Sequence, residues 1–252
     1  MQIDIHFLAL LCGHFLGDFV LQTDGLVQRK AKQARWLLCH VLLVSVLTWI
    51  LLGTLDAWWL VIFVFVLHLL VDYIKLKIVN NRQTKSDHDF LLFIGDQALH
   101  ILFTVLLWTW LSRSGTGASL TNHWVEIWGA DYAKSLLLLT GLAVGVSGVG
   151  IVLMHQMTGF ASELADKVKQ GLPKGGKTIG TLERLLVFMF VLAGRPEGIG
   201  FVIAAKSVFR IGELTNREDR NHAEYIMIGT LRSFTYALVV AFITRWLMTQ
   251  IE

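Results

Sequence analysis

Six long apolar segments restrict this chain to a membrane environment. A helix needs about 20 mostly apolar residues to cross the hydrocarbon core of a bilayer. Of the 252 residues, 54% are hydrophobic and only 16% are charged, which excludes a disordered chain and argues against a soluble enzyme. The expected fold class is all-α, a polytopic bundle of transmembrane helices. Its six clear spans are 3–22, 35–52, 57–79, 90–112, 132–156 and 223–247.

The segments outside these spans are less regular. Two shorter apolar runs, 178–194 and 197–212, flank a break at Pro196, so they form either two tilted spans or a re-entrant hairpin. Residues 160–172 have apolar side chains at four-residue spacing. This spacing favours an interfacial helix, and a polar linker is the alternative. The Gly-, Ser- and Thr-containing segment 113–131 is typical of an external loop.

We expect two halves, 1–112 with four helices and 132–252 with the broken pair. Short loops rich in Lys and Arg remain on the cytoplasmic side of a membrane, which predicts that both termini lie outside. The net charge of +3 is small and dispersed. It excludes the basic face of a nucleic-acid-binding protein and leaves the lipid bilayer as the predicted partner. The basic segments are 23–35, 75–89, 157–178 and 213–222.

Histidine and aspartate recur at four-residue spacing in the first four predicted helices. Side chains four residues apart lie on one helix face, about one turn from each other. His precedes Asp in the first and third helices, and the order is reversed in the oppositely directed fourth helix. The side chains therefore share one layer, roughly 6–10 Å thick, and the repeat suggests a duplicated hairpin, 3–52 and 57–112. The residues, called the His/Asp cluster below, are His14, Asp18, His40, His68, Asp72, Asp96 and His100.

A divalent metal is the partner that we expect for the His/Asp cluster. Each charged side chain at mid-bilayer costs on the order of 2.5–3.5 kcal/mol, so such groups face each other or a wet cavity. Imidazole and carboxylate are good ligands for zinc, and manganese and iron are alternatives. Gln22 and Gln97 are expected to support the ligands by hydrogen bonding. The competing interpretations are a proton or ion relay and a purely structural polar network.

A second group of ionisable residues lies in the C-terminal half. Lys206 and Arg210 share a helix face, where like charges repel and favour a bound anion. A phosphorylated substrate would supply that anion, whereas the alternative is that these long side chains reach the membrane interface. Together with Arg184 they form the predicted anion-binding set. Glu183 and Glu224 are expected in the polar core of this half.

The chain resembles an uncharacterised family of bacterial inner-membrane proteins, a domain of unknown function. Its first four helices are also loosely similar to bacterial membrane-bound metal-dependent hydrolases, which implies a hydrolytic metal site and a bacterial plasma membrane. The residues that carry the family resemblance are His14, Gly17, Asp18, Phe19, Gln22, His40, His68, Asp72, Asp96, Gln97, His100, Gly180, Glu183, Arg184, Ala205, Lys206, Ser207, Glu224, Tyr225, Gly229 and Thr230.

The function that we expect is a membrane-embedded metal-dependent hydrolase. Its His/Asp site would lie near the cytoplasmic leaflet and act on a phosphorylated or lipid substrate. A cation- or proton-coupled transporter or channel would use the same residues as a relay. A structural or regulatory membrane subunit is the second alternative. Neither substrate nor oligomeric state follows from the sequence.

Overall fold

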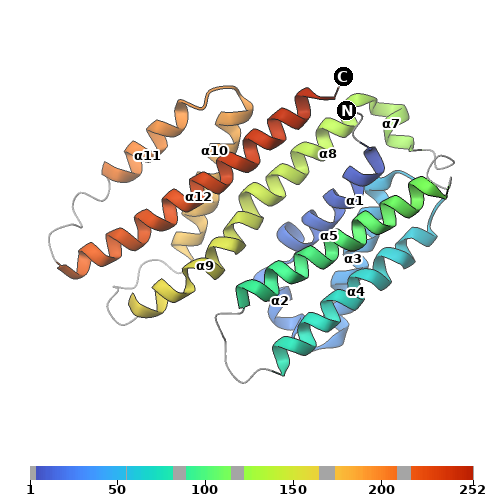
Figure 1. Ribbon diagram of the computed structural model, residues 1–252, viewed down its shortest axis with the longest axis horizontal. Helices are drawn as coiled ribbons and strands as arrows, with labels where there is room; N and C mark the ends of the chain where they lie inside the picture. The colour runs from blue at the N-terminus through green and yellow to red at the C-terminus, as the bar shows by residue number, and fades with distance from the viewer. Residues whose placement is uncertain are drawn as a thin grey trace. The chain divides into compact units, whose positions relative to one another are not determined.

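The computed structural model describes residues 4–54, 56–81, 89–114, 122–164, 174–208 and 217–251, and they contain helices and no β-strand. The all-α prediction is confirmed (Figure 1). The chain divides into two compact units. Unit 1 comprises Met1–Thr140 with Met248–Glu252, and unit 2 comprises Gly141–Leu247.

Four helices of unit 1 pack in a closed ring. Helix α1 packs against α3 and α5, and α4 packs against the same two helices. Side chains that point inward from all four helices therefore meet at a common centre. The elements of unit 1 are α1 (Ile5–Phe15), the π-helix η1 (Leu16–Leu21), α2 (Asp24–Lys30), α3 (Ala34–Leu52), α4 (Trp59–Asn80), α5 (Asp89–Arg113), α7 (His123–Trp128) and most of α8 (Ala130–Leu142).

In unit 2, helix α10 packs against η2, α9 and α11. Gly194 follows α10 with a φ of 72°, a left-handed conformation that suits glycine and ends the helix before α11. These two helices correspond to the predicted broken pair. The elements of unit 2 are the end of α8, the π-helix η2 (Ala143–Gly148), α9 (Val149–Leu164), α10 (Gly175–Leu192), α11 (Gly198–Val208) and α12 (Arg217–Thr249).

The helices have the lengths and composition of membrane spans. Five are long and apolar enough to cross a membrane, and the bent pair Ile5–Leu21 and Asp24–Lys30, with a 95° bend, makes a sixth crossing if it is counted as one span. The six predicted spans are therefore confirmed as apolar helices. The five long spans are Ala34–Leu52, Trp59–Asn80, Asp89–Arg113, Ala130–Thr158 and Ala223–Thr249.

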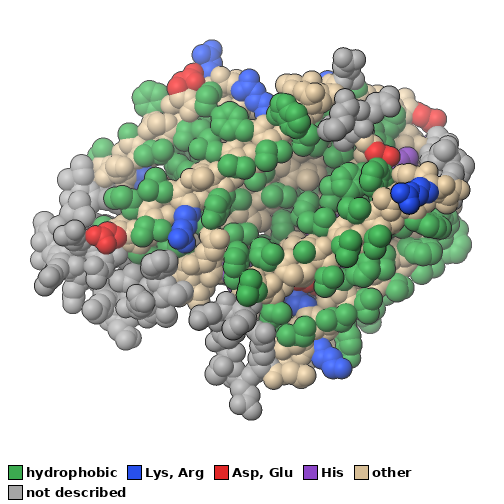
Figure 2. All heavy atoms as spheres, in the orientation of Figure 1, with side chains coloured by type: hydrophobic (Ala, Val, Ile, Leu, Met, Phe, Trp, Pro, Cys, Tyr) green, Lys and Arg blue, Asp and Glu red, His purple; other side chains and the backbone are tan. Residues whose placement is uncertain are grey.

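Large hydrophobic side chains on these helices face outward. Ile62, Leu91 and Phe201 expose 54%, 63% and 77% of their surface, respectively. Figure 2 shows hydrophobic side chains along the length of the helices on the visible face. Such extensive apolar exposure is not stable in water, but it is expected where lipid surrounds the helices. The chain is a multi-pass membrane protein.

Two glycines allow α1 to approach α3 closely. A Cβ atom on Gly13 would lie 2.8 Å from the Cα of Thr48, and one on Gly17 would lie 2.5 Å from Cγ2 of Val44. The glycines are four residues apart, as are the two residues that they contact, so one face of α1 fits one face of α3. This small-xxx-small arrangement is typical of helix pairs in membranes.

A short helix occupies part of the segment 113–131, which we expected to be an external loop. Helices α7 and α8 close the C-terminal end of α3, because Trp124 Nε1 of α7 donates to the carbonyl of Ile50 at 2.6 Å and Tyr132 Oη of α8 donates to that of Leu51. These donors satisfy carbonyls that a helix end leaves without intrahelical partners. Residues 115–121 lie outside the described residues.

The interfacial helix predicted for 160–172 falls largely outside the described residues. Helix α9 continues without a break to Leu164, and residues 165–173 are not among those that the structure describes. Residues 160–164 therefore extend the preceding apolar helix.

The close α1–α3 contact predicts opposite effects for two Gly-to-Ala substitutions. Gly13→Ala should destabilise the protein by about 1–3 kcal/mol, because the new methyl group overlaps Thr48. Gly95→Ala is the matched control in α5, where a Cβ meets nothing within 4 Å, and it should be neutral or stabilising. Thermal unfolding in detergent would measure both changes. Equal midpoints for the two variants would show that α1 and α3 do not pack this closely.

Candidate metal centre

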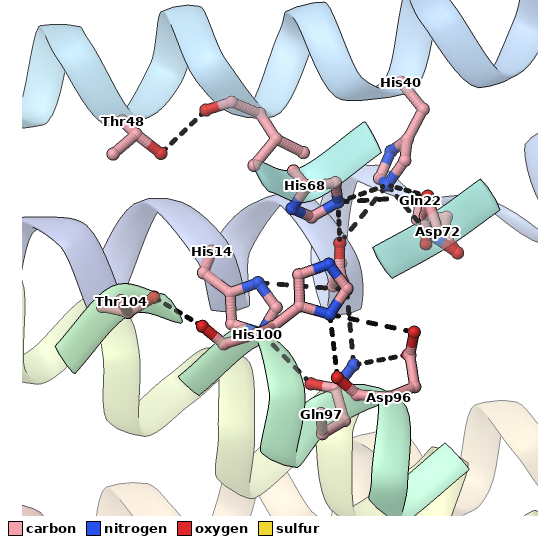
Figure 3. A network of polar contacts seen from close by, with 12 residues as sticks. His14, Gln22, His40, Thr48, His68, Asp72, Asp96, Gln97, His100 and Thr104 are labelled. Carbon is pink, nitrogen blue, oxygen red and sulfur yellow. Dashed lines mark hydrogen bonds and ion pairs between the residues drawn. The ribbon is translucent and has the colours of Figure 1, made fainter. Parts of the chain in front are cut away.

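All seven residues of the His/Asp cluster are buried in the centre of the four-helix ring. None exposes more than 8% of its surface. In Figure 3 the rings of His14, His68 and His100 lie together, with Gln97 and Asp96 on one side and His40 on the other. The structure thus brings together the side chains that the four-residue spacing placed in one layer. They come from α1 and η1 (His14, Asp18), α3 (His40), α4 (His68, Asp72) and α5 (Asp96, His100).

The π-helix η1 determines where Asp18 points. A π-helix has a wider turn than an α-helix and commonly occurs at functional sites. Here His14 Nδ1 on the same helix is 4.0 Å from Asp18 Oδ2. The histidines of the neighbouring helices are nearer, since Oδ1 of Asp18 is 3.3 Å from Nε2 of both His40 and His68. The carboxylate therefore faces α3 and α4 more closely than its own helical partner.

Asp18, His40 and His68 form a compact triangle of ligand atoms. The two imidazole Nε2 atoms are 3.4 Å apart, and each is 3.3 Å from Oδ1 of Asp18. This oxygen is buried and has no hydrogen-bond partner among the described residues. A buried carboxylate oxygen without a donor is costly, so a positive charge at the triangle would stabilise it.

Around this triangle, amide side chains hold the rings in place. Gln22 Nε2 donates to Nε2 of His40 at 3.1 Å. Gln97 accepts from His14 Nε2 at 3.3 Å and donates to Oδ2 of Asp18 at 3.3 Å and of Asp96 at 3.1 Å. Gln97 therefore lies where the sequence predicted a supporting residue. Gln22 instead donates to the nitrogen that His40 contributes to the triangle, so it would have to turn away for that nitrogen to bind a metal.

One ring nitrogen of His100 forms a hydrogen bond within its own helix, and the other has no hydrogen-bond partner among the described residues. Its Nδ1 donates to the backbone carbonyl of Asp96 at 2.9 Å, which fixes the tautomer and leaves Nε2 as an acceptor. Nε2 is buried with no partner among the described residues. Ligating histidines commonly have this arrangement, with the second nitrogen bound to a carbonyl. Two further groups of residues could hold an ion, namely His14, His68 and His100, and Asp18, Asp96 and His100.

Two lysines that the sequence analysis assigned to basic loops belong to the centre. Lys30 Nζ lies 2.8 Å from Oδ2 of Asp72, and Lys75 Nζ lies 2.7 Å from Oδ2 of Asp96. Lys75 follows Asp72 by three residues on α4, so helical spacing could have revealed it. No such pattern marks Lys30, because the bend after η1 breaks the helical register.

A cavity of about 40 Å³ adjoins the histidines. A buried water needs roughly 10–15 Å³, so a few waters fit. The hydroxyls of Thr48 and Thr104 donate to their own helices at 2.8 and 2.9 Å, and their oxygens remain acceptors. The lining residues are His14, His68, His100, Thr48 and Thr104, with Leu10, Val44, Val64, Leu67, Phe103 and Leu107.

The predicted anion-binding residues of unit 2 are engaged by separate partners. Arg184 is buried, and Nε donates to the carbonyl of Val146 in η2 at 2.7 Å, while Nη1 donates to Ser233 Oγ at 3.4 Å. Lys206 instead forms a 2.7 Å ion pair with Glu183. Arg184 and Lys206 are therefore held by different hydrogen-bond partners, and these contacts do not join them in one anion site.

The other two predicted residues of this group do not support a buried site. Glu224 has an exposed side chain on α12, so it does not belong to the polar core as expected. The four-residue periodicity cannot show which face of an isolated helix is covered. Arg210 lies outside the described residues.

The hydrogen bonds of Arg184 predict a stability effect in unit 2. Arg184→Lys keeps the charge but removes the fork that joins Val146 and Ser233, so we expect a loss of about 1–3 kcal/mol in the free energy of unfolding. Arg195→Lys is the control, since Arg195 is exposed and pairs only with exposed Glu197. Thermal unfolding would compare the two variants. A midpoint lowered equally by both would contradict a specific role of the buried guanidinium.

Comparison with known proteins gives one match. Residues 6–127 match the model of a family described as a protein of unknown function (DUF3307). No curated protein and no solved structure is significantly similar to the chain. The matched segment includes every residue of the His/Asp cluster. The segment that holds that cluster is therefore similar to the DUF3307 family of proteins of unknown function.

Proposed function

We propose that the N-terminal half is a membrane-embedded metal-dependent hydrolase that acts on a phosphorylated or lipid substrate. Asp18, His40 and His68 would hold one divalent metal ion. We take zinc as the metal, and two imidazoles with one carboxylate are also acceptable to iron or manganese. We further propose a bacterial inner-membrane location with the basic loops in the cytoplasm, as the distribution of Lys and Arg predicts.

The spacing of the three ligand atoms carries this proposal. A metal about 2.0–2.1 Å from each of its tetrahedral ligands separates those ligands by roughly 3.3–3.4 Å. The distances within the triangle of Asp18, His40 and His68 are 3.3, 3.3 and 3.4 Å. The spacing therefore matches that of three ligands around one metal ion.

The charge of the centre also supports a cation at Asp18. The positive charge of Lys30 neutralises the negative charge of Asp72, and the positive charge of Lys75 neutralises the negative charge of Asp96. No lysine or arginine of the described residues lies within 4 Å of Asp18. One divalent metal beside this single carboxylate leaves an excess positive charge. An anionic ligand from water or from a phosphate group would cancel that excess, as a hydrolytic site requires.

The remaining residues would position and deprotonate water. A metal held by three protein ligands with a free position activates water as a nucleophile. The adjoining cavity has room for such a water beside His68 and His100. His100 Nε2 has no hydrogen-bond partner among the described residues, so it can accept the proton. Gln97 would keep Asp18 and His14 in place through its amide group.

The proposal predicts about one equivalent of bound metal per chain. His68→Ala removes an imidazole ligand and should abolish retention, which elemental analysis of the purified protein measures for zinc, iron and manganese together. His123→Ala is the matched control, because His123 lies in α7 and its side chain is 40% exposed. It should retain the metal.

Two outcomes would contradict a metal centre. Wild-type protein with less than about a tenth of an equivalent after growth in metal-rich medium would exclude tight binding. A His68→Ala variant that loses stability but no ion would indicate a structural polar network instead.

Ion transport is a second candidate function, and the size of the cavity favours it. About 40 Å³ admits waters or a small ion but no lipid headgroup, so a hydrolase must open further to admit its substrate. Transport would require the same buried carboxylate as a relay. Asp18→Asn distinguishes the two functions, since it removes charge with little change in volume.

For a hydrolase, wild-type protein in proteoliposomes should release phosphate from a phosphorylated lipid and take up no zinc. Asp18→Asn should then lose both bound metal and turnover. The His123→Ala variant, reconstituted in the same way, is the control for correct insertion. Zinc or proton uptake that Asp18→Asn abolishes, with tightly held metal unchanged, would favour transport and overturn hydrolysis.

A further inference from the structure

Lys30 reaches the metal-binding triangle from outside the helical ring. It is the last residue of α2, which follows the 95° bend after η1. Its side chain is buried, and Nζ lies 2.8 Å from Oδ2 of Asp72. Helix α2 is held nearby, because it packs against α3 and Asn80 donates to the carbonyl of Ala31 at 3.4 Å. The lysine is thus a fixed part of the centre.

The oxygen that Lys30 contacts lies close to a fourth ligand position. Asp72 Oδ2 is 3.6 Å from Nε2 of His40 and 4.0 Å from Nε2 of His68. A fourth tetrahedral ligand would lie roughly 3.3–3.4 Å from each of its neighbours. Both distances are longer than this, so Asp72 Oδ2 lies beside the two imidazole ligands but short of a ligand position, and it would have to move toward the metal to bind it. Figure 3 shows His40 and Asp72 on the same side of the network.

We propose that Lys30 is a positioning residue that competes with the metal for Asp72 and so keeps the fourth coordination position open. This inference rests on the metal centre proposed above. A lysine ammonium at 2.8 Å forms a strong charge-assisted hydrogen bond, which holds the carboxylate oxygen away from the ion. Closed four-ligand zinc sites are structural, whereas catalytic sites keep one position free. Lys30 therefore determines to which of these two classes the centre belongs.

Lys75 provides an internal comparison. It forms a similar pair with Asp96 on the other side of the network, at 2.7 Å. Within the described part of the chain, Asp96 forms ion pairs or hydrogen bonds with Lys75, His100 and Gln97 and not with His40 or His68, the two imidazole ligands. Removing Lys75 frees a carboxylate that lies near Asp18 and His100. Removing Lys30 instead frees one that lies beside both imidazole ligands. The two lysines alter the total charge equally but differ in the ligand that they release.

The test is metal affinity, measured by competition with a chelator in the full-length protein. Lys30→Met should tighten Zn²⁺ binding by about 10–100-fold, the range of effects of residues that support metal ligands. Lys75→Met should tighten it by a clearly smaller factor. The visible absorption of bound Co²⁺ should change in Lys30→Met and not in Lys75→Met, because only the first variant gains a ligand.

The double variant Lys30→Met with Asp72→Asn covers the case in which Lys30→Met fails to fold. It replaces an ion pair by a neutral pair of similar size and should bind Zn²⁺ as the wild type does. Unchanged affinity in Lys30→Met, an equal gain in Lys75→Met, or a tenfold loss in the double variant would each overturn the role of Lys30. If wild-type protein binds no metal, the proposed function fails instead.

Discussion

The centre of the N-terminal unit is organised around one buried carboxylate that has no lysine or arginine partner among the described residues. Asp18 lies among four helices at a depth where lipid surrounds the outside of the ring. Asp72 and Asp96 have the same burial, but each has a lysine partner. Charge in such surroundings is stable only when it is paired. The imidazoles that converge on Asp18 are therefore the basis of our proposal that they share a metal ion with it.

This convergence follows from the construction of one helix. Gly13 and Gly17 allow α1 to approach α3 closely, which brings Asp18 within reach of His40. The π-turn that contains Asp18 then directs its carboxylate toward His40 and His68. The 95° bend between η1 and α2 changes the direction of the chain, and Lys30 at the end of α2 then lies beside Asp72. The glycines, the π-turn and the bend of this first segment thus each determine which side chains meet at the centre.

Both units place a polar residue beside a π-helix, but the electrostatic outcomes differ. In unit 2, Arg184 donates to the carbonyl of Val146 within η2 and to side-chain hydroxyls. Its hydrogen bonds are made within the protein, as expected of a residue that stabilises a helical bundle. In unit 1, Asp18 Oδ1 and His100 Nε2 have no such partners among the described residues. This contrast is the reason that we place the proposed metal centre in the N-terminal unit and propose a structural role for Arg184.

The sequence by itself determined the helical class, the six apolar spans and the membership of the His/Asp cluster. These features depend on segment length and on a four-residue period, which are local properties of the chain. Only the tertiary structure showed which residues from different helices lie close together. Lys30 joined the centre because of a bend, Glu224 proved exposed, and helix α7 occupied part of a predicted loop. The spacing of Asp18, His40 and His68 likewise required three helices to pack at fixed separations and rotations, because hydrogen bonding within a helix leaves its position relative to its neighbours open.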